Sequence, residues 1–167
     1  RQVHGASLTG IDLDQAALDG AQQLAREHGL ADRLRLIQAD AWSSGIENEF
    51  DVLTSNGLTI YEPDDQRVTA LYASFASMLK PGGFLVSSFL TPPPELADTS
   101  SWNMQAIDPK AMALQHLLFV RIIQVKWACF RTEEQTRGQL EQAGFKIVRV
   151  MPDTANIFPT VIAQKAG

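Results

Sequence analysis

The sequence predicts an α/β domain built on a mostly parallel sheet, with helices on both faces and an antiparallel strand pair near the C-terminal end. Three observations support this fold class. Short apolar runs alternate with amphipathic helical segments across residues 6–90. The connections between them are short, which implies right-handed βαβ crossovers and a parallel sheet. Two last strand-like runs, residues 145–150 and 157–164, are suited to antiparallel pairing.

The composition is that of an ordinary globular chain. With 45% apolar and 20% charged residues, the 167 residues suit one domain and exclude a long disordered chain. A net charge of −5 gives no electrostatic support for nucleic-acid binding. The single cysteine, Cys129, cannot form an internal disulfide, which fits a reducing cytoplasm. The longest apolar stretch, residues 117–125, is too short to span a membrane. We therefore expect one cytoplasmic domain, residues 1–167, that binds a small molecule and neither nucleic acid nor membrane.

The first predicted unit is a strand, a helix and a second strand. Residues 6–13 form an apolar run, and Asp14 after it is a good helix N-cap. Gly29 is a natural C′ stop for the helix that follows. Residues 34–39 form the second strand, which leads into Asp40 and a polar loop. The apolar positions of the helix recur at helical spacing: Ala17, Leu18, Ala21, Leu24 and Ala25.

A second strand, helix and strand follow. Residues 50–55 are a short run between polar borders, as expected for a strand of a parallel sheet that is covered on both faces. Residues 80–83, Lys-Pro-Gly-Gly, have the composition of a type II turn that begins a strand over residues 84–90. Between them, residues 65–79 predict an amphipathic helix with one apolar stripe: Val68, Leu71, Tyr72, Phe75, Met78 and Leu79.

Three prolines at residues 92–94 break regular structure and open a segment, residues 91–131, that we expect to be a substrate-covering insertion. Within it, Asp108 and Pro109 predict the start of a helix over residues 110–128. This helix is apolar on most sides and is therefore expected to be buried or to cover a pocket.

The C-terminal part predicts one helix and the two last strands. Thr132 and Gln135 fit a capping box, and Gly144 marks the end of the helix that they begin. Pro159 cannot donate a backbone hydrogen bond, so the last strand is expected near a sheet edge or a bulge.

Asp12 ends the first predicted strand, and an acidic residue at such a strand end normally binds a ribose. It is usually the second half of a bipartite site, whose glycine-rich first half lies about 20 residues upstream. Only eleven residues precede Asp12, and the chain begins at Arg1 rather than at methionine. We therefore expect an N-terminally truncated domain, without its first strand and its glycine-rich loop.

The order and spacing of five segments resemble the class I S-adenosylmethionine-dependent methyltransferases. The segments are GIDLD (10–14), QADAW (38–42), FDVLTSNG (50–57), LKPGGFLV (79–86) and AGF (143–145). The resemblance covers nearly the whole chain, from residue 7 to residue 164, and it implies a Rossmann-like fold.

The resemblance assigns cofactor contacts to three strand ends. Asp12 matches the carboxylate that accepts hydrogen bonds from both ribose hydroxyls, and Leu13 matches the apolar residue against adenine. Asp40 matches the acceptor for the adenine amino group, with a backbone contact from Ala41 and stacking area from Trp42. The turn beside the methionine moiety is matched by Ser55, Asn56 and Gly57. Each residue also has a simpler interpretation in helix capping, turn formation or core packing.

The chain departs from the family pattern at the first strand and the G-x-G-x-G turn, which have no counterpart in it. In the family this turn holds the carboxypropyl end of the cofactor, and the strand is central in the sheet. We therefore expect this chain alone to bind S-adenosylmethionine poorly and to leave a strand edge exposed.

The acceptor side is less well defined. The family's in-line methyl transfer depends mainly on alignment and exclusion of water, so a general base is needed only for some acceptors. The candidate substrate contacts are Tyr61, Glu62, Trp102, His116 and Arg131, with Tyr61 and His116 also candidate catalytic groups. Glu62 also fits a helix entry, His116 a core histidine, and Arg131 a surface or capping role. Asp12 and Asp14 alone do not indicate a metal site.

The sequence therefore predicts methyl transfer from S-adenosylmethionine to a small, partly apolar molecule held under residues 91–131, an activity that truncation would impair. Two alternatives remain open. One is a non-catalytic binding or scaffold module, favoured by the missing glycine loop. The other is a nicotinamide-dependent oxidoreductase, since an acidic strand end also binds that cofactor's ribose.

Overall fold

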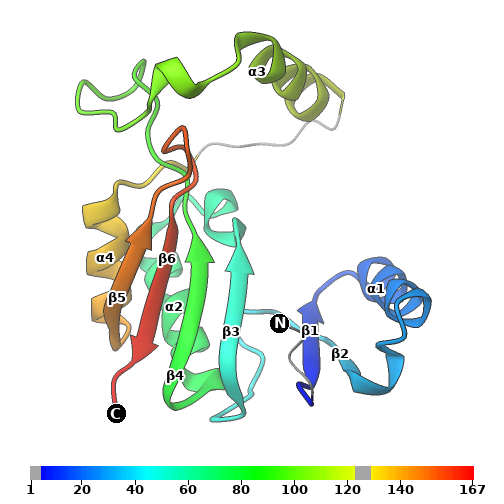
Figure 1. Ribbon diagram of the computed structural model, residues 1–167. Coiled ribbons are helices and arrows are strands. Elements are labelled where there is room, and N and C mark those ends of the chain that lie inside the picture. The colour runs from blue at the N-terminus through cyan, green and yellow to red at the C-terminus, as the bar shows by residue number, and fades with distance from the viewer. Residues whose placement is uncertain (1–4, 123–128) are drawn as a thin grey trace. The chain divides into compact units, whose positions relative to one another are not determined.

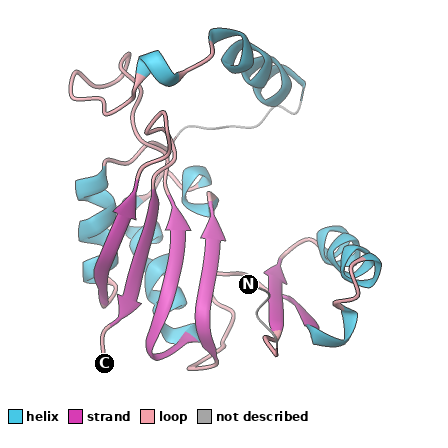
Figure 2. Cartoon of the chain, in the orientation of Figure 1, coloured by secondary structure: helices cyan, strands magenta, loops and turns pink. Residues whose placement is uncertain are grey.

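The computed structural model describes residues 5–122 and 129–167, and the chain divides into two compact units, Arg1–Gly45 and Ile46–Gly167. The first unit is a strand–helix–strand arrangement, and the second is a four-stranded sheet with its helices (Figures 1 and 2). The predicted α/β class is confirmed, including the antiparallel pair near the C-terminal end.

The first unit contains a parallel strand pair connected by a helix. Its elements are β1 (Leu8–Asp12), α1 (Gln15–Glu27), the short 3-10 helix η1 (Ala31–Arg33) and β2 (Leu34–Gln38). The two strands run in register over their full lengths, from Leu8 opposite Leu34 to Asp12 opposite Gln38. Both strands therefore end at the same edge of this sheet.

Capping sets both ends of α1, as the sequence predicts. The Asp14 carboxylate accepts from the backbone N–H of Ala16 at 2.9 Å. Gly29 has a φ of +66°, and the N–H of Leu30 donates to the carbonyl of Ala25 at 2.7 Å, which makes a Schellman motif. Two of the predicted apolar positions are wrong: Ala17 and Leu24 are exposed, whereas Leu18 is buried.

The second unit is a sheet with strand order β3-β4-β6-β5. The pair β3–β4 is parallel, and the pairs β4–β6 and β5–β6 are antiparallel. The strands are β3 (Phe50–Asn56), β4 (Leu79–Ser88), β5 (Phe145–Met151) and β6 (Thr160–Lys165), and the helices packed on them are α2 (Asp65–Met78) and α4 (Glu133–Gln142). The two helices pack against each other and against β4 and β5 respectively, so they cover the same face of this sheet.

The core of the second unit lies between these helices and the sheet. The fully buried side chains include Val68, Leu71 and Tyr72 on α2 and Leu140 on α4. Strand side chains such as Leu85 complete this layer. The predicted apolar stripe of residues 65–79 is thus confirmed as the buried face of α2.

Two expectations about the strands need correction. The predicted turn at residues 80–83 lies inside β4. Its residues form an irregularity between the pairs Phe50–Leu79 and Val52–Phe84, and Gly82 has the expected positive φ of +75°. The last strand is not at an edge, because β6 lies between β4 and β5. Pro159 precedes that strand, where its carbonyl accepts from the N–H of Phe89 at 3.3 Å and its missing N–H costs no ladder bond.

The segment after β4 carries little regular structure until α3. It contains the 3-10 helix η3 (Met104–Ala106), α3 (Pro109–His116) and a π-helical stretch, η4 (Leu117–Ile122). Asp108 caps α3 as predicted. The predicted α-helix over residues 110–128 is shorter than expected, and residues 123–128 lie outside the described residues. Of the two alternatives for it, burial is wrong for four side chains that are 40–65% exposed, and covering a pocket stays a prediction. The four are Leu114, Leu117, Leu118 and Ile122.

Candidate functional site

In the first unit, Asp12 and Asp40 follow from two adjacent strand ends. The carbonyl of Asp12 accepts from the N–H of Ala39 at 3.0 Å, which continues the parallel pairing one residue past Gln38. The register therefore places Asp12 at the end of β1 beside the loop that begins with Asp40. Carboxyl ends of parallel strands are the usual position of ligand sites in α/β folds.

Each of these carboxylates is held by its own loop. Asp12 Oδ1 accepts from the N–H of Asp14 at 2.9 Å, and Asp40 Oδ1 accepts from the N–H of Trp42 at 2.9 Å. A carboxylate has about four acceptor positions, so both groups keep capacity to accept further hydrogen bonds. Asp12 is exposed and Asp40 is half-buried. These loops thus orient two acceptor-only groups and leave one of them open to solvent.

Apolar surface accompanies the two carboxylates. Leu13, directly after Asp12, is 65% exposed, and both Ala41 and Trp42 are half-buried. Acceptors for hydroxyl and amino donors next to an exposed apolar side chain suit a nucleoside. All five predicted nucleoside contacts therefore belong to one compact unit: Asp12, Leu13, Asp40, Ala41 and Trp42.

In the second unit, β3 and β4 end side by side. Asn56 lies opposite Ser88 in the parallel register, and the Ser88 hydroxyl donates to Asn56 Oδ1. Gly57 follows with a φ of +80° and begins the 3-10 helix η2 (Leu58–Tyr61), so the predicted turn is confirmed. Ser55 precedes Asn56 on β3 and is half-buried. The sequence reasoning missed Ser88, although the Ser-Ser pair at the end of the neighbouring strand was a usable signal.

The acceptor-side candidates Tyr61 and Glu62 lie at the end of η2. The Tyr61 side chain is 56% exposed. The hydrogen bond from Arg67 Nε to Glu62 Oε2, at 2.7 Å, lowers the pKa of the Glu62 carboxyl. The N–H of Asp64 donates to the other oxygen of Glu62 at 3.0 Å. Glu62 is therefore held as a carboxylate at the start of α2. These contacts agree with the simpler interpretation of Glu62 as part of the entry to this helix.

Trp102 and His116 lie in the segment after β4. The indole N–H of Trp102 donates to the Thr91 hydroxyl at 2.9 Å and to the Thr91 carbonyl at 3.1 Å. Thr91 in turn donates to the carbonyl of Asn156 at 2.7 Å. These contacts fasten the start of the segment to the connection between β5 and β6. His116 is the last residue of α3.

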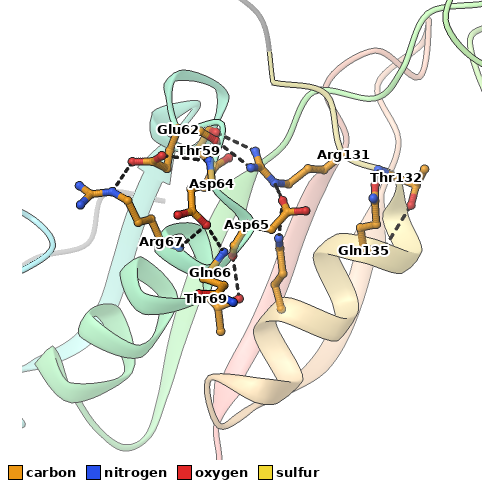
Figure 3. Close-up of polar contacts among 11 residues, drawn as sticks. Thr59, Glu62, Asp64, Asp65, Gln66, Arg67, Thr69, Arg131, Thr132 and Gln135 are labelled. Carbon is orange, nitrogen blue, oxygen red and sulfur yellow. Dashed lines mark hydrogen bonds and ion pairs between the residues drawn. The ribbon is translucent and has the colours of Figure 1, made fainter.

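Arg131 is a buried charged group, 4% exposed, and not a surface residue. Figure 3 shows its guanidinium between the start of α2 and the turn before it, with donors directed to Thr59, Glu62 and Asp65. Its partners come from residues more than 60 positions away in sequence, which no local pattern indicates. The role of Arg131 as a substrate contact stays a prediction.

Two further properties concern the described part of the chain. Within residues 5–122 and 129–167, no group of three or more His, Cys, Asp and Glu side chains is placed to hold a metal ion. None of the helices in the same ranges combines the length and apolar character that a membrane crossing requires.

The parallel strand ends with paired carboxylates define a nucleotide-binding α/β domain of the Rossmann-like class. Residues 1–83 match the family model described as "Methyltransferase domain". Among curated relatives, the ubiquinone biosynthesis O-methyltransferase of Methylococcus capsulatus is 37% identical over 86 residues, which are 52% of this chain and 35% of the relative. The corresponding protein of Thiobacillus denitrificans is 34% identical over 86 residues and 36% of its length. The chain thus spans about a third of these curated relatives.

Solved structures agree on the fold. A structure described as a possible exported protein from Bordetella parapertussis has a TM-score of 0.88 and 56% identity, covering 98% of this chain and 54% of that one. A methyltransferase structure from Methanosarcina mazei, described as dependent on S-adenosylmethionine, has a TM-score of 0.69 and 22% identity, covering 97% and 83% of the two chains. The chain belongs to the class I S-adenosylmethionine-dependent methyltransferases.

Proposed function

We propose that this protein transfers a methyl group from S-adenosylmethionine to a small-molecule acceptor. One observation carries the proposal: two parallel strands end in register, one with Asp12 and the exposed Leu13, the other with Asp40 in its following loop. This donor and acceptor pattern fits the adenosine part of the cofactor, whose ribose hydroxyls and amino group need acceptors.

The first unit supplies the nucleoside contacts in this proposal. Asp12 accepts from the ribose hydroxyls and Asp40 accepts from the adenine amino group. Leu13 and Trp42 provide apolar area against the base, and Ala41 provides a backbone contact. The loops that already hold Oδ1 of both carboxylates reduce the ordering needed on binding, which favours affinity.

In the second unit, the residues proposed to contact the methionine moiety are Ser55, Asn56 and Gly57. The Ser88 hydroxyl fixes the Asn56 side chain. When bound, S-adenosylmethionine supplies a methyl group on a sulfonium, which reacts in line with an acceptor atom. The residues of the chain then act by alignment and by exclusion of water. Tyr61 and His116 are the candidates for a proton acceptor where the substrate needs one.

The proposed acceptor is a hydroxyl-bearing, partly apolar molecule. The curated relatives are named O-methyltransferases, which supports oxygen as the acceptor atom. The segment that we propose to cover the substrate, residues 91–131, exposes large apolar side chains, and these would favour an apolar acceptor. They are Leu96, Met104, Leu114, Leu117, Leu118 and Ile122. Trp102 and Glu62 remain the further proposed contacts.

Fold alone does not decide the reaction, because a [4+2]-cyclase has a TM-score of 0.67 to this chain. Titration calorimetry of the natural gene product with S-adenosylhomocysteine separates the alternatives. The methyltransferase proposal expects binding of this ligand and none of a nicotinamide dinucleotide. The oxidoreductase alternative expects the reverse, and a scaffold module expects neither.

Single-residue variants then test the site itself. Removing a charged hydrogen-bond partner costs about 1.5–3 kcal/mol, so Asp12→Asn and Asp40→Asn should each weaken binding by roughly 10–150-fold. Asp32→Asn, an exposed acid on η1 of the same unit, is the matched control and should bind as the unmodified protein does. Equal affinity for all three variants would contradict the proposed nucleoside site.

Mass-spectrometric detection of a 14-dalton gain on candidate phenols and alcohols tests turnover directly. We further propose a cytoplasmic location, on the single cysteine alone. Because the Bordetella structure is described as a possible exported protein, cell fractionation with an epitope tag is the direct test. Recovery outside the cytoplasm would overturn that part of the proposal.

A further inference from the structure

The guanidinium of Arg131 bonds to backbone oxygens at both ends of one turn of the second unit, residues 59–62. Its Nη1 donates to the backbone oxygen of Thr59 at 2.9 Å, and its Nη2 donates to the backbone oxygen of Glu62 at 2.7 Å. Its Nε donates to Asp65 Oδ1 at 2.8 Å. All three guanidinium nitrogens therefore have protein partners (Figure 3).

The two backbone oxygens bracket Ile60 and Tyr61. Ile60 is 5% exposed and anchors the turn in the core, whereas Tyr61 is 56% exposed and projects from it. A guanidinium is a rigid planar fork, so contacts with carbonyls on both sides fix the path of the residues between them. Arg131 thus constrains the backbone of the turn that carries Tyr61.

The backbone of the same residue closes the segment that follows β4. The N–H of Arg131 donates to the carbonyl of Leu90 at 2.8 Å. The two residues that flank the segment 91–130 are therefore hydrogen-bonded neighbours. Arg131 thus contacts Leu90 through its backbone and the turn that carries Tyr61 through its side chain.

The ion pair with Asp65 is the lesser part of this arrangement. The Asp65 side chain is 63% exposed, and ion pairs with a solvent-exposed partner contribute little. The Thr59 residue, by contrast, is 2% exposed, so its carbonyl has no access to bulk water as a substitute partner. The geometry of the fork matters here more than its charge, and lysine cannot reproduce it.

We propose that Arg131 is a positioning residue for the methyl acceptor, which holds the Tyr61 turn in a fixed place relative to the base of the covering segment. The proposal rests on the proposed function, in which Tyr61 faces the acceptor. Arg131 acts through that turn and does not itself touch cofactor or acceptor.

Hydrogen exchange tests the positioning without any substrate. The amides of Ile60 and Glu62 donate to the carbonyls of Gly57 and Thr59 at 3.1 and 3.3 Å, so their exchange reports the order of the turn. In Arg131→Lys we expect exchange in residues 57–62 to rise about tenfold or more, with β5 unchanged. Arg137→Lys, an exposed arginine on α4, is the matched control and should leave both regions unchanged.

Kinetics of the natural gene product test the consequence. Misplacing a reacting group by about 1 Å costs on the order of a hundredfold, so Arg131→Lys should lower kcat/KM for the acceptor by roughly 10–100-fold. The Kd for S-adenosylhomocysteine should stay within about twofold, because the nucleoside contacts belong to the other unit. A purely structural role would instead weaken acceptor and cofactor binding together. Asp65→Asn keeps both carbonyl contacts and should keep near-normal acceptor kinetics.

Two results with the variants would overturn the proposal: unchanged exchange in residues 57–62 of Arg131→Lys, or an Asp65→Asn variant that is as impaired as Arg131→Lys. If Arg131→Lys does not fold, amide exchange in the unmodified protein is the test. Protection of Ile60 and Glu62 like that of β4 supports the proposal, and exchange as fast as in the loop at residues 43–49 contradicts it. If no acceptor is methylated, the exchange result still stands alone, and only the proposed function fails.

Discussion

The hydroxyl of Thr136 on α4 leads to a prediction of increased stability. Thr136 is 1% exposed, and among the described residues its Oγ1 has no hydrogen-bond partner. A buried hydroxyl without a partner costs about 1–3 kcal/mol. Valine has nearly the same shape and a similar helix propensity, so Thr136→Val removes that cost without a new cavity.

The expected gain in unfolding free energy is about 1–2 kcal/mol, which allows for imperfect fit of the added methyl group. For a chain of this size, each kcal/mol raises Tm by about 2–4 °C, so the variant should melt roughly 2–8 °C higher. Urea unfolding followed by circular dichroism measures the change, and an unchanged m-value shows that the unfolded state is unaffected.

The matched control is Thr69→Val on α2. Thr69 is half-exposed, and its hydroxyl donates to the carbonyl of Asp65 at 3.0 Å, so its replacement should change stability by about 0.5 kcal/mol or less. A Thr136→Val variant that loses 1 kcal/mol or more, with Thr69→Val unchanged, would refute the reasoning. It would show that the Thr136 hydroxyl is hydrogen-bonded in solution.

Three further predictions concern the second unit. Gly83→Ala should lower the free energy of unfolding by about 1–3 kcal/mol, because an added Cβ would lie 2.9 Å from the Lys80 carbonyl oxygen. Gly138→Ala in α4 meets open space and should raise that free energy by about 0.8–1 kcal/mol in the same urea assay. Burial raises the pKa of Tyr72 to about 12, so stability is complete below pH 10 and falls as the pH rises from 10 to 12, by roughly 2–3 kcal/mol. Tyr72→Phe should lack this loss when unfolding is compared at pH 9 and pH 11.5, and an identical alkaline loss in the variant would assign it to other groups. Leu140→Ala should cost about 2–5 kcal/mol, because the side chain is fully buried, and a loss below 1 kcal/mol would show that the core collapses around it.

Local signals predicted most helix ends and strand positions. Asp14 and Gly29 delimit α1, and Thr132 with Gln135 begins α4, because capping depends on residues within one turn of each helix. The chemistry of a cap is visible in a few neighbouring residues, and no tertiary contact is needed to recognise it.

The misses depend on contacts between distant segments. Pro159 suggested a strand near a sheet edge or a bulge, but it precedes β6, whose position between β4 and β5 follows from the whole sheet order. Leu114 suggested a buried helix, but burial depends on what lies opposite it, and the side chain is 57% exposed. Arg131 has partners on η2 and α2 that only the folded chain brings near.

The nucleoside residues were predicted from the family resemblance, and the structure places Asp12 at the end of one strand and Asp40 after the adjacent parallel strand. Asp12 and Asp40 are 28 residues apart, yet the parallel register brings their loops together, as the sequence pattern implies. The acceptor side could not be predicted in this way. Its candidates, such as Trp102, depend on a long segment whose contacts with the Thr91 and Asn156 region follow no periodic pattern.

The hydrogen bond between Arg131 and Leu90 has a consequence for protein engineering. Because residues 91–130 begin and end at bonded neighbours, the segment can be lengthened, shortened or exchanged with little effect on the order of the strands. Doubling a loop costs only about 0.6 kcal/mol of closure entropy. A set of chimeras with different segments grafted between Leu90 and Arg131 would therefore test whether this segment decides the proposed acceptor choice.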